Sequence, residues 1–158
     1  MVTAQSLRDQ VTEKVNEVKG LVSELSDDEA ASNPAEGEWC VKEVLSHLIG
    51  EELGSAKAGL KRFLDEETPQ IDVNPGVSYF EVRNNLSTAE LLVAFEDEYG
   101  KLGEFLGGLS EEQLNRKANV PLLKDSPIGE YPTLSQWAGA LLNLHVNEHV
   151  GQIRNLCQ

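Results

Sequence analysis

Three histidines are the side chains of this chain best suited to bind a metal ion. His145 and His149 stand four residues apart in a stretch whose apolar residues recur at helical spacing, so their imidazoles lie about 40° apart on one helix face. The motif is not HExxH, because Val146 follows His145, and this disfavours metalloprotease chemistry of that type. His47 lies within a second apolar stretch, VLSHLIG, where an unpaired buried imidazole would be costly.

Each histidine taken alone also has an ordinary structural explanation. A single histidine on an apolar face is more commonly a core or interface residue with a hydrogen-bond partner, and HxxxH pairs occur on many solvated helices. The combination is more informative, because all three lie in apolar-flanked helical stretches and two have ligand spacing. It indicates a metal site formed by His47, His145 and His149, with packing histidines as the alternative.

Polar side chains near the histidines are candidates for supporting roles. Glu51 follows His47 by four residues, so a continuous helix would place its carboxylate on the same face. Gln152 follows His149 by three residues and is expected on the imidazole face, whereas Glu148 points to one side of it. We therefore predict Glu51 as the catalytic residue, orienting the second nitrogen of a ligand or shuttling protons.

Two tryptophans share one spacing relative to the histidines. Trp39 precedes His47 by eight residues, and Trp137 precedes His145 by eight. We expect both rings to pack at the ends of the fold. The common spacing also suggests that the two helices present matching edges to one site.

Amphipathic helical patterns account for most of the chain. Their apolar residues recur at helical spacing over residues 4–25, 39–64, 87–108 and 133–158. The last two patterns begin at capping boxes, S-x-x-E at 87–90 and T-x-x-Q at 133–136, and a further box at 110–113 predicts a short extra helix. No segment alternates with a period of two, so no sheet is expected.

Two connections between the expected helices are long. Residues 68–85 and 115–131 contain Pro and Gly and exceed the roughly 2–8 residues that usually join helices in a bundle. Long connections let the chain cross the bundle, so helices adjacent in sequence need not be antiparallel neighbours. We predict an all-α fold, a four-helix bundle with long crossover connections, forming a single domain over residues 1–158.

Charge and composition exclude several classes of partner. The 158 residues include 27 Asp and Glu against 13 Lys and Arg, a net charge of −14, which argues against binding nucleic acid or an anionic membrane surface. No apolar run approaches the roughly 20 residues of a membrane span, and the first residues lack a signal-peptide pattern, so we expect a cytoplasmic protein. Cys40 and Cys157 are too few for a disulfide scaffold and are expected to be buried, reduced residues.

The sequence resembles the DinB/YfiT-like metalloenzyme superfamily, which includes bacillithiol- and mycothiol-dependent transferases. The most specific parts of the resemblance are EWCVKEVLSHLIGEE, ending at Glu52, and HVNEHVGQI, beginning at His145. The resemblance implies a four-helix bundle in which His47 from the second helix joins His145 and His149 from the last. It further implies a divalent metal, most commonly zinc or nickel, and a low-molecular-weight thiol as co-substrate.

Three neutral imidazoles would leave a tetrahedral metal with one open position, as in catalytic rather than structural sites. Nitrogen ligands suit zinc, nickel, copper or iron(II) better than magnesium or calcium. Because no ligand is anionic, the centre would keep its full charge and favour the ionised form of a bound water or thiol near neutral pH. Residues that line the mouth of the site would select the substrate, and Tyr79, Phe80 and Tyr131 in the long connections are candidates.

Two functions of different classes follow from these residues. The first is a metal-dependent transferase or hydrolase that acts on a small molecule, for example by transferring a thiol to an electrophile, in an apolar pocket between the second and fourth helices. The alternative is a non-catalytic, stress-related binding or dimerisation module with a structural or vestigial metal site. A homodimer is compatible with a small bundle, although no exposed apolar stripe in the sequence assigns one.

Overall fold

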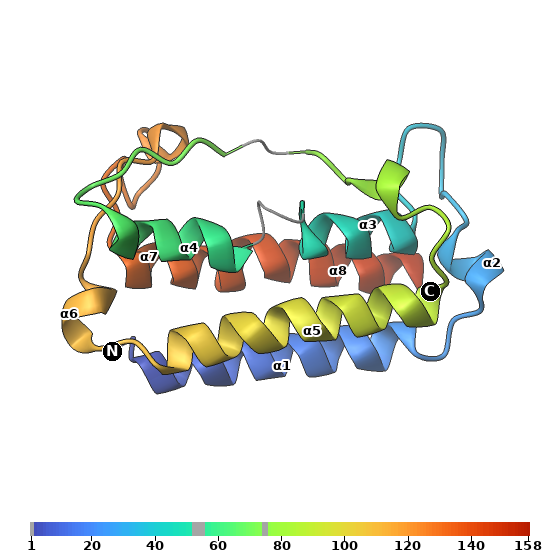
Figure 1. The fold of residues 1–158 in the computed structure, drawn as a ribbon. Helices are drawn as coiled ribbons and strands as arrows, with labels where there is room; N and C mark the ends of the chain where they lie inside the picture. Colours follow the sequence, from blue (N-terminus) through green and yellow to red (C-terminus); the bar gives the residue numbers. More distant parts are fainter. Residues whose placement is uncertain (1, 52–55, 74–75) are drawn as a thin grey trace.

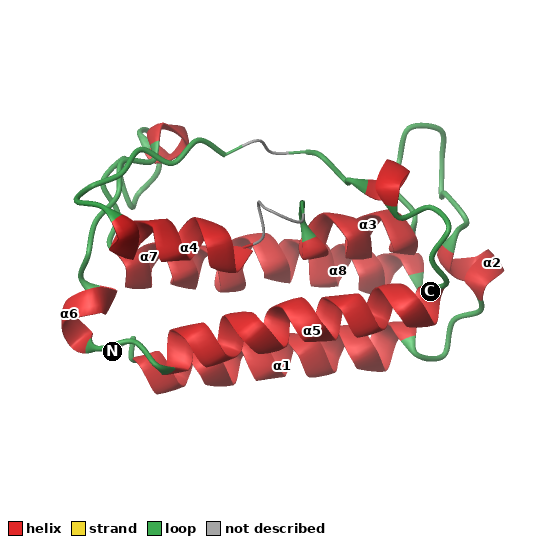
Figure 2. Ribbon diagram, in the orientation of Figure 1, coloured by secondary structure: helices red, strands yellow, loops and turns green. Residues whose placement is uncertain are grey.

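A computed structural model describes residues 2–51, 56–73 and 76–158, and within these residues the chain forms helices but no strands (Figures 1 and 2). Two isolated β-bridges join connecting segments. None of the described helices is long and apolar enough to cross a membrane.

The main helices are α1 (Ala4–Val22), α3 (Val41–Ile49), α4 (Ala56–Asp65), α5 (Thr88–Gly107), α7 (Leu134–Ala140) and α8 (Asn147–Leu156). The shorter ones are α2 (Asp27–Ala30), α6 (Glu111–Leu114), the 3-10 turns η1 (Phe80–Val82) and η2 (Pro121–Leu123), and the π-helical turn η3 (Leu141–Val146).

The helices form a four-helix bundle with crossover connections, as predicted. α1 packs against α5 and α8, while α3 packs against α5 and α8 from the opposite side. Figure 1 shows that α1 and the α7–α8 unit run in one direction, whereas α3, α4 and α5 run in the other. The first two helical units are therefore diagonal to each other, and the second and third are parallel. This order requires the chain to travel back along the bundle between α4 and α5, which explains the length of that connection.

Side-chain caps set the beginnings of the helices. The predicted boxes at Ser87, Ser110 and Thr133 are all present, and each hydroxyl accepts a hydrogen bond from the backbone three residues later. Ser26 forms a further box that opens α2, and α1 ends at Val22 rather than continuing to residue 25. The apolar stripes of the four helical units meet in one core, whose largest fully buried side chains include Phe63, Phe95, Leu7, Leu45, Leu91 and Leu142.

The expected continuous helix over residues 39–64 is wrong. α3 ends at Ile49, because Gly50 has φ 80° and ψ −175°, a conformation open to glycine but not to residues with a side chain. The Arg83 guanidinium donates hydrogen bonds to the carbonyls of Ser46, at 3.1 Å, and of Gly50. A cation at this end also complements the helix dipole. Glu51 therefore lies outside the helix, and helical geometry does not place it on the face of His47.

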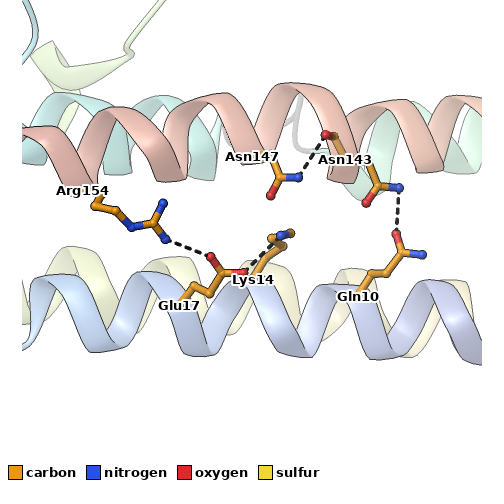
Figure 3. A network of polar contacts seen from close by, with 6 residues as sticks. All are labelled: Gln10, Lys14, Glu17, Asn143, Asn147 and Arg154. Carbon is orange, nitrogen blue, oxygen red and sulfur yellow. Dashed lines mark hydrogen bonds and ion pairs between the residues drawn. The ribbon is translucent and has the colours of Figure 1, made fainter.

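A row of polar side chains joins α1 to the last helical unit (Figure 3). Asn143 Nδ2 donates to Gln10 Oε1 at 3.1 Å, and Arg154 Nη2 lies 3.4 Å from Glu17 Oε2. Glu17 also pairs at 3.1 Å with Lys14, which is buried despite its charge. A pair open to solvent, such as Arg154 with Glu17, contributes about 0–1 kcal/mol, so we infer that the contacts between the two parallel helices set their register more than they stabilise them.

The helix end at Gly50 yields a stability prediction. Gly50→Ala should lower the free energy of unfolding by about 1–3 kcal/mol, because alanine is strained at a positive φ. Gly100→Ala is the matched control: Gly100 lies in the middle of α5, with no atom within 4 Å of an added Cβ, and the change should stabilise by about 0.5–1 kcal/mol. Urea denaturation measures both, and equal effects of the two substitutions would contradict this account of the helix end.

Candidate metal centre

The structure brings the three histidines together from three segments of the chain. α3 carries His47, the π-helical turn η3 carries His145, and α8 carries His149. One nitrogen from each ring can be chosen so that all three lie within 4.8 Å of one another. The Nε2 atoms of His47 and His145 are 3.2 Å apart, and the ring centroids are separated by 4.6–5.0 Å. All three side chains are half-buried, so a small molecule can approach the cluster.

The last helical unit departs from α-helical geometry at the site itself. Residues Leu141–Val146 form a π-helical turn between α7 and α8, and this turn contains His145. π-helical turns are rare and occur frequently at functional sites, where the wider turn redirects a side chain. The HxxxH spacing predicted two imidazoles on one face, and the structure places them there with 4.7 Å between their centroids. No residue in the sequence indicated that the turn containing His145 would be π-helical.

Two of the imidazoles have a fixed hydrogen-bond partner on the side away from the cluster. His47 Nδ1 lies 2.7 Å from the carbonyl oxygen of Val77, and His149 Nδ1 lies 2.9 Å from Oε1 of Gln152. Both partners are acceptors, so each Nδ1 carries a proton, and in the neutral form of each ring Nε2 keeps its lone pair. The sequence placed Gln152 correctly on the imidazole face. It could not identify Val77, since a backbone carbonyl has no side-chain signature.

Trp39 forms a wall of the cluster. Its ring centroid is 5.0 Å from that of His47 and 6.2 Å from that of His149, and it stacks on His149 with an interplanar angle of 21°. Trp137 instead packs from α7 against the hydrophobic core. The expectation that both tryptophans only pack at the bundle ends is therefore incomplete. The shared eight-residue spacing pointed to a relation with the histidines, but only Trp39 has one.

Burial keeps two of the imidazoles neutral. Burial, followed by the nearby imidazoles of His149 and His47, lowers the pKa of His145 to about 4. Burial also lowers the pKa of His47, although the hydrogen bond to Val77 opposes this shift. At pH 7 both rings are therefore uncharged, which is the form that binds a metal.

The predicted carboxylates lie outside the hydrogen-bonded cluster. Among the described residues, the imidazoles form hydrogen bonds with the Val77 carbonyl, the Gln152 amide and one another, and none with a carboxylate. Glu148 is exposed on α8, and Glu51 is exposed just beyond α3. Glu51 lines a cavity of about 870 Å³ that is also lined by Val77, whose carbonyl accepts from His47. The role of Glu51 as catalytic residue stays a prediction.

Two cavities flank the cluster. The larger is the cavity of about 870 Å³ beyond Val77, which the predicted mouth residues Tyr79 and Phe80 line, whereas Tyr131 is not among its described lining residues. The smaller has a volume of about 520 Å³ and reaches His149 directly. It lies between the loop before α3 and the end of α8, and is lined by Pro34, Gly37, Glu38, Trp39, His149, Gln152, Asn155 and Leu156. Its size is typical of small-molecule sites, roughly 300–1,000 Å³.

The donor set fits a divalent metal of intermediate softness. Three neutral imidazole nitrogens close together suit zinc, nickel, copper or iron(II), and hard oxygen-seeking cations poorly. Hydrogen bonds that hold the Nδ1 atoms of ligating histidines are usual at such sites. His47, His145 and His149 can therefore hold one ion and leave part of its coordination sphere to a substrate.

Comparison with known proteins places the chain in a family. The model of the DinB superfamily matches residues 10–153. The chain belongs to the DinB superfamily. The fold of this DinB-superfamily protein is similar to that of YfiT from Bacillus subtilis, described as a probable metal-dependent hydrolase with an unusual four-helix bundle topology. The two are 23% identical, with a TM-score of 0.76 over 97% of this chain and 85% of YfiT. No curated protein sequence matches the chain.

The lowered histidine pKa values predict how the metal-free protein responds to acid. Histidine in the unfolded chain titrates near pH 6.5, whereas the pKa of His145 in the folded protein is about 4. Between these values the unfolded state binds more protons, so the free energy of unfolding should fall as the pH decreases from 6.5 to 4.

Urea denaturation in the presence of a chelator, at several pH values, measures this fall. His145→Gln should make it less steep, while Leu144→Gln, at an exposed position of the same turn, should leave it unchanged. Parallel pH profiles for the wild type and His145→Gln would contradict the lowered pKa.

Proposed function

We propose that this DinB-superfamily protein is a divalent-metal-dependent enzyme that acts on a small molecule, with His47, His145 and His149 as the metal ligands. One observation carries the proposal: one nitrogen from each of the three rings lies within 4.8 Å of the other two. In addition, His47 and His149 each have a hydrogen-bond acceptor at Nδ1, on the side of the ring away from the cluster. Zinc or nickel is the expected metal. When bound, the ion supplies Lewis acidity and stabilises the anionic form of a nucleophile.

The surrounding residues prepare the site for that role. The Val77 carbonyl and the Gln152 amide orient their imidazoles before a metal arrives, so little ordering remains to be done on binding. The low pKa values of His47 and His145 keep both nitrogens available at neutral pH. Trp39 covers one side of the cluster and excludes water there, while the cavity beside His149 admits a substrate.

Two reactions are compatible with this arrangement. The fold shared with YfiT favours hydrolysis of a small electrophilic substrate. The alternative is S-transfer, in which the thiol loses its proton and the sulfur bonds to an electrophilic carbon, while the bond from that carbon to its leaving group breaks and the leaving group departs with the electron pair. In that reaction we propose Glu51, exposed to solvent at the end of α3, as the proton acceptor. Both reactions require a nucleophile that is deprotonated near neutral pH, and a metal held by the three histidines would favour that form.

Metal binding is the first test of the proposed function. The purified, untagged protein should contain or take up about one equivalent of zinc or nickel, measured by elemental analysis and calorimetric titration. Replacing His47, His145 or His149 with Ala should abolish tight binding, while Glu148→Gln, adjacent to His149 but exposed, should not. Full affinity in the His145→Ala protein, or no uptake and no thermal stabilisation by excess metal, would favour the non-catalytic module.

The hydrogen bond from His149 to Gln152 predicts that substitutions of Gln152 change the metal affinity by graded amounts. Gln152→Leu should weaken metal binding about 10–100-fold, because the imidazole loses the acceptor that fixes its protonated nitrogen. Gln152→Glu retains an acceptor and should bind metal at least as tightly as the wild type. Equal affinities for the Leu and Glu variants, with unchanged circular dichroism, would show that Gln152 does not position His149.

A further inference from the structure

The charges around the cluster restrict what can bind beside it. Of the described residues that line the two cavities, five are carboxylates and one is a guanidinium. The guanidinium is that of Arg83, which already donates to the backbone carbonyls of Ser46 and Gly50 at the end of α3. In the cavity that reaches His149, Glu38 is the only one of the described lining residues that is an Asp, Glu, Lys or Arg. A ligand carrying carboxylates would find no lysine or arginine among these residues.

The same cavity offers a surface for a flat, cationic group. Trp39 lines it, and indole is the best of the side-chain rings at attracting a cation. Pro34 and Leu156 add apolar surface, and the side-chain amides of Gln152 and Asn155 add hydrogen-bonding groups. Glu38 immediately precedes Trp39 in the sequence, so negative charge and the aromatic face belong to the same short segment.

This segment is held in place before any ligand binds. Asn33 Nδ2 donates at 2.7 Å to the carbonyl of Glu38 and at 2.7 Å to the carboxylate of Glu43, which itself caps the start of α3. The turn that leads into the segment is closed by a hydrogen bond from the Glu38 N–H to the carbonyl of Ala35. A wall fixed in this way reduces the ordering cost of binding.

We propose that the cavity between Trp39 and the end of α8 binds an organic cation, a protonated amine attached to a flat apolar group, as the substrate of this site. The cation would lie against Trp39 and Glu38, and the rest of the molecule would extend towards His149. This assignment deepens the proposed function and rests on it, since the cavity reaches the metal position through His149. For S-transfer it favours a neutral or amine-bearing thiol over one rich in carboxylates.

Three aromatic probes of similar size and different charge test the preference: benzylamine, benzyl alcohol and benzoate. The chain has two tryptophans, so Trp137→Phe leaves Trp39 as the only one, and its fluorescence reports binding in the cavity. In metal-free protein at 0.15 M salt, benzylamine should change the emission of Trp39 and bind about tenfold more tightly than benzoate. Calorimetry on the unsubstituted protein repeats the comparison in case Trp137→Phe perturbs the fold.

Glu38→Gln should weaken benzylamine binding about two- to fivefold and leave benzyl alcohol unaffected, since an exposed charge contributes modestly. Glu148→Gln is the matched control, because it removes an equal charge next to His149 from a residue that does not line the cavity. Binding of benzoate as tight as that of benzylamine, or equal effects of the two substitutions, would overturn the assignment.

Metal uptake is measured separately on the same protein. If the probes fail to bind as expected, the metal site can still be tested by its own measurement. If the protein takes up no metal, the preference among the three probes can still be determined.

Discussion

The hydrogen bond from His47 to the Val77 carbonyl connects the candidate site to the topology of the bundle. The donor lies on α3 and the acceptor on the connection between α4 and α5, thirty residues later. If a short turn joined α4 to α5, the chain would stay at one end of the bundle and would not pass α3, so it could not supply this acceptor. The parallel arrangement of the second and third helical units forces the connection to return along the bundle (Figure 1), and that return brings Val77 to the imidazole.

The same arrangement explains how two distant helices share one site. Because α1 and α3 are diagonal, α3 can lie directly against the last helical unit, and His47 meets His145 and His149 across that contact. The polar row between α1 and α8 (Figure 3) acts on the opposite side of the last unit. We infer that its hydrogen bonds hold the unit in the register that points both imidazoles inward, since a bundle of aliphatic side chains alone tolerates sliding.

Burial has two opposing consequences at the cluster. It lowers the pKa values of His47 and His145, which makes their nitrogens better available at neutral pH, and it lowers the stability of the metal-free protein in acid. The rings remain only half-buried, so the cluster stays open to the cavity beside Trp39. The metal-free protein thus gives up some stability in acid, and the histidine cluster stays accessible to a ligand. Such a trade-off between stability and activity is common in proteins.

The sequence by itself determined the helical class, the positions of three capping boxes and the common face of His145 and His149, because these depend on periodicity and on short-range hydrogen bonds. The addition of His47 to that pair rested on the apolar setting of all three histidines and on the family resemblance. It failed at Gly50, where an apolar helical pattern continues past a residue whose positive φ ends the helix, and this moved Glu51 off the face of His47. The tertiary structure alone decided the contact of Trp39 with the imidazoles, the carbonyl of Val77 and the π-helical turn at His145. Each of these depends on segments that meet only after folding, and neither a backbone acceptor nor a widened turn leaves a mark on residue type.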